Sequence, residues 1–136
     1  MEFTADTLKS AVCRKLKDVT EGFTIYKNTP SKGTKLPCFF VSQKSVDSVR
    51  LGKGKYENEY LIIIRYHDVD VNESINDNMA LFIQEQLDLI EWDGMKFVPL
   101  KLSSVISDGV LQVLATFKVR IFKPEDNPSM GNIEFK

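Results

Sequence analysis

The chain has 136 residues, of which 43% are hydrophobic and 27% are charged. This length and balance fit a single globular domain, and they exclude a chain that is disordered throughout, a collagen-like fibre and a low-complexity linker. The 18 basic and 19 acidic residues leave a formal net charge of −1, so no overall basicity draws the whole molecule onto nucleic acid or anionic lipid.

The sequence predicts neither a membrane span nor a signal peptide. Its apolar runs, such as Leu61–Ile64, are far shorter than the ~20 residues that a transmembrane helix needs. The first ten residues lack the basic and apolar regions of a signal peptide. We therefore expect the chain to act in a cytoplasm, with Cys13 and Cys38 as reduced, buried thiols.

The N-terminal region predicts an amphipathic helix that runs to about Asp18. Apolar residues recur three and four positions apart between Leu8 and Val19, and Thr4 or Asp6 is placed to cap the helix. Basic residues fill the remaining positions. One side of this helix is therefore expected to lie on a core.

Two strands are expected next. Phe23–Tyr26 is predicted as a short strand, and Pro37 marks the entry to a second one, Cys38 to about Gln43. Residues 44–55 are polar and contain glycine, with four basic residues against one acidic. Little apolar burial offsets the ordering entropy of such a segment, so it predicts a long, mobile hairpin loop.

The middle of the chain predicts a buried strand and a second helix. Glu59–His67 carries apolar residues on both faces, which indicates a central strand. From Ile75 to Ile90 the apolar residues follow the helical period, and Asn72 or Ser74 is placed to cap this helix.

The C-terminal third predicts a closing hairpin. Met95–Ile106 is expected to be a strand, and its Pro99 indicates an edge or a bulge. Asp108-Gly109 is a turn signal, and Val110–Phe122 alternates cleanly between apolar and polar residues. Residues 124–136 are rich in Pro, Asn, Ser and Gly, so a flexible tail is predicted there.

These elements predict a single α+β domain over residues 1–123, in the order α-β-β-β-α-β-β. Two amphipathic helices should pack on one face of a mostly antiparallel sheet, as a two-layer sandwich. Alternation in the last strand assigns the face that they cover. The expected core contains Leu8, Val12, Leu16, Phe82, Ile83, Ile90, Leu111, Val113, Phe117 and Val119.

The sequence offers little for catalysis. A serine or cysteine triad would depend on the single histidine, His67. The run from His67 to Asp70 imitates a metal site only weakly, and a strand-end surface histidine is the commoner case. Leu51–Lys55 contains two glycines and two lysines but lacks P-loop spacing. No catalytic residue, cofactor-binding residue or metal ligand is therefore predicted.

Charge is segregated along the chain. Eight acidic residues and no Lys or Arg lie between His67 and Gly94, whereas residues 44–55 are basic. A solvated helix face is the commoner explanation, but an oligomer can place the acidic helix of one subunit against the basic loop of the next. The candidate acidic residues are Glu73, Asp77, Glu85 and Asp88, and the candidate basic residues are Lys44, Arg50, Lys53 and Lys55.

Several short segments together follow a family pattern, namely Ile25-Tyr26, Leu36–Val41, Tyr56, Tyr60-x-Ile62-x-Ile64-x-Tyr66, Ile106-x-Asp108-Gly109-Val110-Leu111 and Thr116-Phe117-x-Val119. Over roughly residues 5–123 the chain resembles the small tail terminator (tail completion) proteins of tailed bacteriophages and prophages of Gram-positive hosts. After Leu111 the pattern has His or another polar residue, and this chain has Gln112, which is a loose fit to His. The segment beyond Pro124 has no counterpart in the pattern.

The resemblance implies a structural protein that is not an enzyme and has no cofactor. Members of this class form a ring, usually hexameric, that caps the finished tail tube, stops polymerisation and offers a surface for head joining. The implied partners are further copies of the chain, the tail tube protein, a head-completion or connector protein and, in contractile tails, the sheath. Transient contact with DNA in the lumen is also implied, and contact with a membrane is not. The implied location is the head-proximal tail end of the virion, after assembly in the host cytoplasm.

Two other functions are compatible with the sequence. A small nucleic-acid-binding module would use Arg50, Lys53 and Lys55, with Tyr56 as a stacking group, and its binding of short single strands would depend on salt. A small enzyme or ligand-binding domain would need a deep polar pocket around His67.

Overall fold

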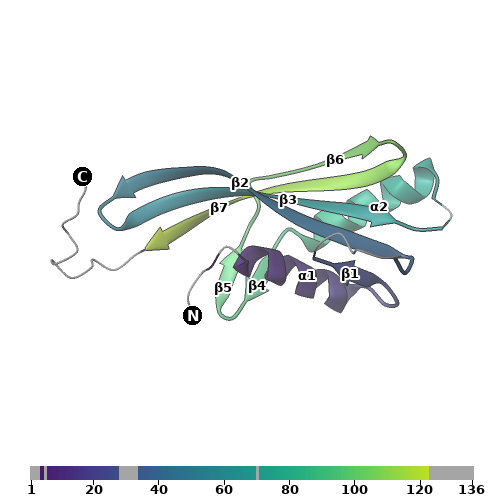
Figure 1. Cartoon of the computed structure of the whole chain (residues 1–136), viewed down its shortest axis with the longest axis horizontal. Helices are drawn as coiled ribbons and strands as arrows, with labels where there is room; N and C mark the ends of the chain where they lie inside the picture. Colours follow the sequence, from purple (N-terminus) through teal and green to yellow (C-terminus); the bar gives the residue numbers. More distant parts are fainter. Residues whose placement is uncertain (1–3, 5, 28–33, 70, 123–136) are drawn as a thin grey trace.

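A computed structural model describes Thr4 and residues 6–27, 34–69 and 71–122 of the chain. These residues form two helices and seven strands (Figure 1). The predicted boundary at residue 123 and the predicted tail lie outside the described residues. The helices are α1 (Thr7–Val19) and α2 (Glu73–Gln86), and the strands are β1 (Thr24–Tyr26), β2 (Cys38–Gly52), β3 (Lys55–His67), β4 (Ile90–Trp92), β5 (Met95–Phe97), β6 (Lys101–Ser107) and β7 (Val110–Phe122).

The main sheet has five strands in the order β1-β2-β3-β7-β6. The short strand β1 runs parallel to β2, and the other neighbouring pairs are antiparallel. Strand β3 lies at the centre, as its apolar residues on both faces predict. The predicted α+β class with a mostly antiparallel sheet is therefore confirmed.

Local chemistry explains where the helices begin. The Asn72 side chain accepts a hydrogen bond from the backbone N–H of Ile75 at 2.9 Å, so Asn72, not Ser74, caps α2. Asp6 stands at the N-cap of α1 but makes no side-chain cap bond. Its carboxylate instead accepts from Ser10 and from Lys27, each at 2.9 Å. This ion pair ties the start of α1 to the end of β1.

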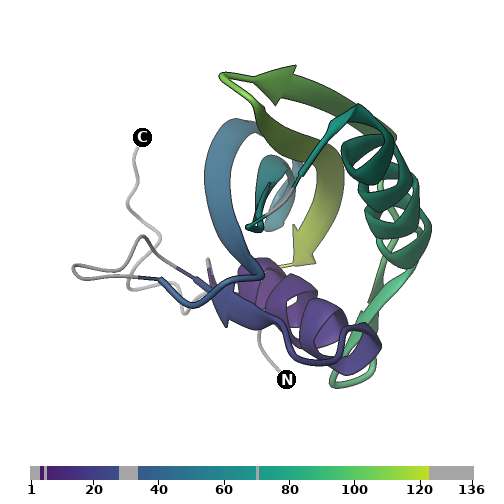
Figure 2. The same ribbon diagram turned by 90° about the vertical axis from the view of Figure 1, so that its right-hand side faces the viewer.

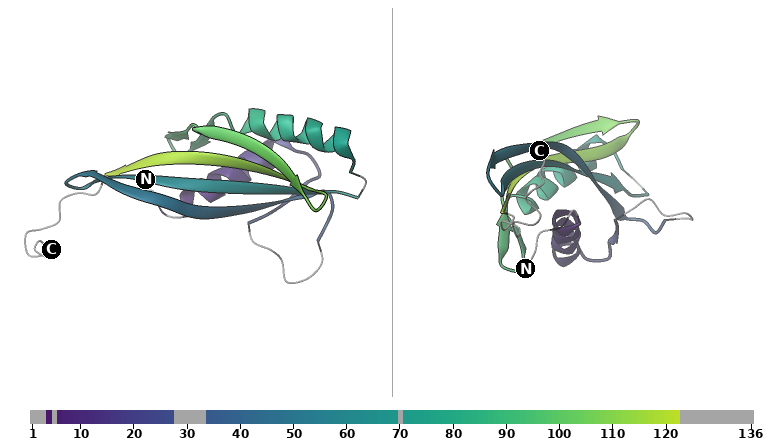
Figure 3. Two further views of the ribbon diagram at one scale, coloured as in Figure 1. Left: turned by 90° about the horizontal axis from the view of Figure 1, so that it is seen from above. Right: turned by 60° about the vertical axis from the view of Figure 1, so that its left-hand side comes forward.

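Both helices pack on the same face of the sheet (Figure 3, right). Alternate residues of β7 from Leu111 to Val119 are buried beneath them, together with the corresponding residues of β2 and β3. The predicted core is confirmed except for Phe82, which is only partly buried and packs at its margin. Ala80, Ile83 and Leu87 form the buried side of α2 and its C-terminal end.

The prediction of a loop over residues 44–55 is wrong, because most of these residues belong to strands. Strands β2 and β3 pair from Cys38 opposite His67 to Gly52 opposite Lys55, so that only two residues remain in the turn. The structure thus has a long projecting hairpin in place of a loop. We call residues 44–59 of this hairpin, together with residues 118–122 of β7, the arm.

The polar composition of the arm has a structural cause. The arm extends beyond the helices (Figure 1), so polar side chains are solvated there while the backbone groups pair in the ladder. Strand β7 pairs with β3 as far as Phe122 opposite Lys55, which makes the arm three-stranded. A register shift between Ser45 and Asp47 marks a bulge in β2.

The strand predicted over Met95–Ile106 is divided in two. Its first part, β5, forms a separate hairpin with β4, and its second part, β6, joins the main sheet. Pro99 lies in the break, where its missing N–H costs no ladder hydrogen bond. Asp108 and Gly109 have φ values of 53° and 77°, so the predicted turn between β6 and β7 is confirmed.

Candidate assembly surfaces

His67 lies at the end of β3 and packs against an aromatic ring. The His67 and Phe40 rings meet edge-on, with centroids 5.0 Å apart. Burial lowers the pKa of His67, and the nearby Arg65 lowers it further. Asp68 accepts a 2.9 Å hydrogen bond from the Tyr66 hydroxyl, and Asp70 lies outside the described residues. Among the residues that the structure describes, no group of three or more His, Cys, Asp or Glu is placed to hold a metal ion.

Both cysteines are free thiols. Burial raises the pKa of Cys13 to about 11, and it also raises the pKa of Cys38, which has no exposed surface. The thiolate is the reactive form of cysteine. The two thiols are therefore placed as packing groups and are poorly suited to act as nucleophiles at neutral pH.

The predicted acidic residues lie together on the exposed side of α2. Glu73, Asp77 and Glu85 are exposed, and their spacings of four and eight residues place neighbouring members on the same side of the helix. Asp88 lies just beyond the end of the helix. Leu81 completes the row and has 59% of its surface exposed. We call these five residues the acidic helix face.

The predicted basic residues all lie on the arm, but the structure distributes them over different faces. Residues opposite one another in adjacent strands share a face of the sheet. Lys44 is opposite Leu61, so it lies on the face away from the helices. Lys55 lies on that same face, because it is an even number of positions away from Leu61 along β3. Arg50 is opposite Tyr56 and lies on the helix side, and Lys53 is in the turn.

The turn of the β2–β3 hairpin and the start of α2 lie at opposite ends of the long axis (Figure 1). Figure 2, viewed along that axis, shows the end where α2 begins. The arm turn and the start of the acidic helix therefore do not meet within one subunit.

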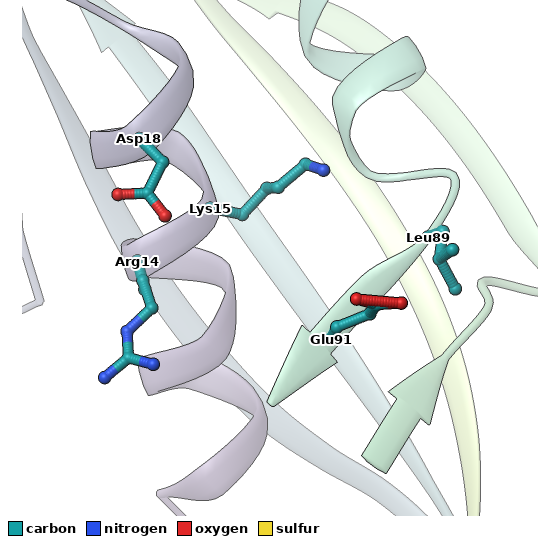
Figure 4. A pocket seen from close by; sticks show the side chains of 5 residues that line it. All are labelled: Arg14, Lys15, Asp18, Leu89 and Glu91. Carbon is teal, nitrogen blue, oxygen red and sulfur yellow. The ribbon is translucent and has the colours of Figure 1, made fainter. Parts of the chain in front are cut away.

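Described residues also line hollows in the surface, of which two bear on the site. One of about 330 Å³ lies between α1 and β4 and is lined by two basic, two acidic and one apolar side chain (Figure 4). The Arg14 guanidinium lies nearby, 4.3 Å from the centre of the Trp92 ring. The other, of about 320 Å³, lies at the bulge of β2. Neither is lined by His67. The first is lined by Arg14, Lys15, Asp18, Leu89 and Glu91.

Sequence reasoning missed one surface, the face of the main sheet that points away from the helices. Leu61 and Ile63 of β3 and Leu114 of β7 lie side by side there, because Ile63 is opposite Leu114 in the ladder. The available signal was the apolar pattern on both faces of β3. It indicates a central strand, but it does not show whether both faces are covered.

Comparison with known proteins identifies the family. A family described as phage tail terminator protein matches residues 7–129. The chain belongs to this family. The fold of this tail terminator protein is similar to that of a chain in the "Virion of native gene transfer agent (GTA) particle", with a TM-score of 0.57 and 15% identity over 87% of this chain and 96% of the other. No curated protein matches the chain.

Family membership confirms the resemblance to phage tail terminator proteins and gives the protein a structural role in a phage tail. The class is that of a virion structural protein, which agrees with the expectation that it is not an enzyme. Neither described helix has the length and apolar character needed to cross a membrane.

Proposed function

We propose that this tail terminator protein forms a ring on the head-proximal end of the finished tail tube. The ring stops tube polymerisation and provides the surface to which the head is joined. Family membership over residues 7–129 is the observation that carries this proposal. The charge distribution supports it, because acidic and basic surfaces on different parts of one subunit suit head-to-tail contacts that close into a ring.

The partners in this proposal are further copies of the chain, six in all as is usual for this class, together with the tail tube protein and a head-completion or connector protein. A sheath is a partner in contractile tails, and DNA passes through the lumen. We propose that the basic residues of the arm and the acidic helix face take part in contacts between subunits, with the arm also placed to meet the tube or DNA. Assembly takes place in the host cytoplasm.

Tube polymerisation in vitro tests the proposal. The tail tube protein is polymerised with and without the full chain, and tube lengths and ends are examined by negative-stain microscopy. Added protein should shorten the tubes and leave ring density at one end. A surface variant outside the acidic helix face and the arm, Lys17→Glu, should do the same. An unchanged length distribution at a molar excess of the protein would contradict capping.

One observation keeps the nucleic-acid alternative open for testing. Arg50 and Tyr56 are opposite each other on the same face of the arm, which joins a cation to an aromatic stacking group. Fluorescence anisotropy with a short single strand of DNA, over a range of salt concentrations, measures this activity. Binding that weakens with salt and is lost in Tyr56→Ala would support it, and absence of binding at low salt would exclude it.

A further inference from the structure

The face of the main sheet opposite the helices has an apolar centre with a lysine on either side, and Asp47, Glu59 and Lys118 form the next row toward the arm. We call this surface the open face. Leu61 of β3 is opposite Lys44 of β2 on one side and Thr116 of β7 on the other, and Thr116 is opposite Lys101 of β6. A row across four strands therefore begins and ends with lysine. The next row is Ser42, Ile63, Leu114 and Ser103, and the one after it is Phe40, Arg65, Gln112 and Val105.

The apolar residues at the centre of the open face, Leu61, Ile63 and Leu114, are half-buried. An antiparallel sheet can leave one face to solvent, but apolar side chains on that face favour a further layer. Helices α1 and α2 both pack on the other face (Figure 3), and neither covers Leu61, Ile63 or Leu114. The open face is therefore available to a layer from outside the part of the chain that the structure describes.

The charges at the border indicate what kind of surface covers it. Further along the sheet, Glu57 lies 3.9 Å from the Lys118 ammonium and 3.4 Å from the Arg120 guanidinium. By contrast, Lys44 and Lys101 have no carboxylate within 4 Å among the described residues, and both are exposed. Among the described residues, the open face thus has a lysine without an ion-pair partner on each side of its apolar centre, which suits an acidic partner with an apolar residue in the middle.

The acidic helix face has this complementary pattern. Leu81, with 59% of its surface exposed, lies between Asp77 and Glu85 on α2. Asp77 and Glu85 are eight positions apart on the helix, which corresponds to a rise of about 12 Å. Three strand spacings separate Lys44 from Lys101, about 14 Å. The two spans match within the reach of the side chains.

We propose that α2 of a second copy of the chain docks on the open face, with Leu81 over the apolar centre and its acidic neighbours toward Lys44 and Lys101. This inference rests on the proposed ring and names the contact that builds it. The two surfaces differ, so the contact is heterologous and each copy offers one of each, which permits a closed ring. A nucleic acid strand matches the lysines but not the apolar centre, so a second copy is favoured over DNA.

A charge exchange tests the contact. The variant Lys44→Glu, Lys101→Glu should raise the protein concentration at which the full chain assembles at least tenfold in sedimentation velocity at low salt. Adding Asp77→Lys and Glu85→Lys to that variant should restore assembly to within about threefold of the wild type, because both surfaces are then reversed. A matched control, Lys17→Glu with Lys96→Glu, changes the net charge equally and should have little effect.

Crosslinking provides a second measurement that does not depend on charge. In the variant Leu61→Cys, Leu81→Cys, mild oxidation should join copies into a ladder of disulfide-linked oligomers, while Leu81→Cys alone should give nothing beyond dimers. The native thiols contribute little background, since Cys38 is fully buried and the pKa of Cys13 is raised to about 11.

The outcomes separate this contact from the proposed function. The contact would be overturned if the wild-type protein stays monomeric, or if the Lys44→Glu, Lys101→Glu variant assembles like the control. It would also be overturned if adding Asp77→Lys and Glu85→Lys does not restore assembly. If the wild type nevertheless shortens tail tubes, the proposed function stands and only the contact is wrong. If the contact is verified but tube length does not change, the ring exists and its capping role is wrong.

Discussion

Phe117 is the largest side chain of β7 that is fully buried under the helices. Replacing it with alanine removes the whole aromatic ring and leaves a cavity, which should lower the free energy of unfolding by about 3–5 kcal/mol. Phe122→Ala is the matched control, because Phe122 lies on the same strand with 68% of its surface exposed. Denaturant titration measures both variants. An unchanged midpoint for Phe117→Ala would mean that the buried face of β7 is assigned the wrong way round.

His67 should make stability depend on pH. Burial and Arg65 lower the pKa of His67 below its ordinary value of 6.5, so the folded protein binds this proton less readily than the unfolded chain. Protonation of His67 therefore favours the unfolded chain. The free energy of unfolding is unaffected by this residue well above pH 6.5, and it decreases as the pH falls below 6.5. His67→Asn should therefore flatten the loss of stability between about pH 7 and pH 5. Urea midpoints at several pH values measure the slopes, and equal slopes in the two proteins would contradict the prediction.

At single positions, the sequence limits the choices without always deciding between them. It allows both Asn72 and Ser74 as the cap of α2, and the fold selects Asn72 through its bond to Ile75. The turn at Asp108-Gly109 was predictable, because a type I′ turn needs positive φ at both central residues and Asp-Gly tolerates it. Local chemistry of this kind requires no knowledge of distant residues.

Among the elements, the arm was the hardest to predict. Its strands are polar because they extend beyond the helices, and polar content in a single sequence also indicates a loop. The pairing of Arg50 with Tyr56 is local, but it lies beside a register shift, and the glycines between these residues are equally compatible with a loop. The pairing of Lys55 with Phe122 joins segments that are far apart in the chain, so it has no local signal.

Amide exchange tests whether the arm is formed in solution. Glu57 and Glu59 of β3 are paired on both sides, with β2 and with β7, so their region should exchange at least tenfold more slowly than the Lys53-Gly54 turn. Hydrogen exchange with mass spectrometry of the full chain at low concentration measures this difference. Uniformly fast exchange from Ser45 to Glu59 would show that the arm opens in the free subunit.

The hairpin β4–β5 shows a different limit. Its signal was present, since Asp93-Gly94 is a turn pair between short apolar segments, and both residues have positive φ in the structure. The break after Phe97 was not, because it depends on Ile90 and Phe97 packing into the core shared with α1. Tertiary packing therefore divided a segment that the sequence pattern left continuous.

For the molecule as a whole, charge segregation was visible in the sequence, but the open face was not. Leu61 and Leu114 become neighbours only through the register of β3 and β7, and Lys44 and Lys101 share a row only through four strands. The sequence thus indicated which charges are candidates for contacts between subunits. The register supplies the apolar surface that the charges surround.

The assembly should weaken as salt rises, with unequal contributions from the basic residues. An exposed ion pair contributes about 0–1 kcal/mol and is screened beyond about 8–10 Å at physiological salt. Lys53 and Lys55 lie near the end of the arm, away from the apolar centre of the open face, so reversing both to Glu should weaken assembly through long-range attraction alone. Reversing Lys44 and Lys101 acts on a contact from which water is excluded, and its effect should be larger and should persist at higher salt.

Sedimentation of the wild type and of both double reversals, at low and high salt, distinguishes these contributions. The effect of Lys53→Glu, Lys55→Glu should disappear at high salt, whereas that of Lys44→Glu, Lys101→Glu should remain in part. If all three proteins assemble equally at every salt concentration, charge has no part in assembly, and the acidic helix face is a solvated surface. If the Lys53 and Lys55 reversal has the larger and more persistent effect, the end of the arm is the contact between subunits, because only close contact with little water resists screening.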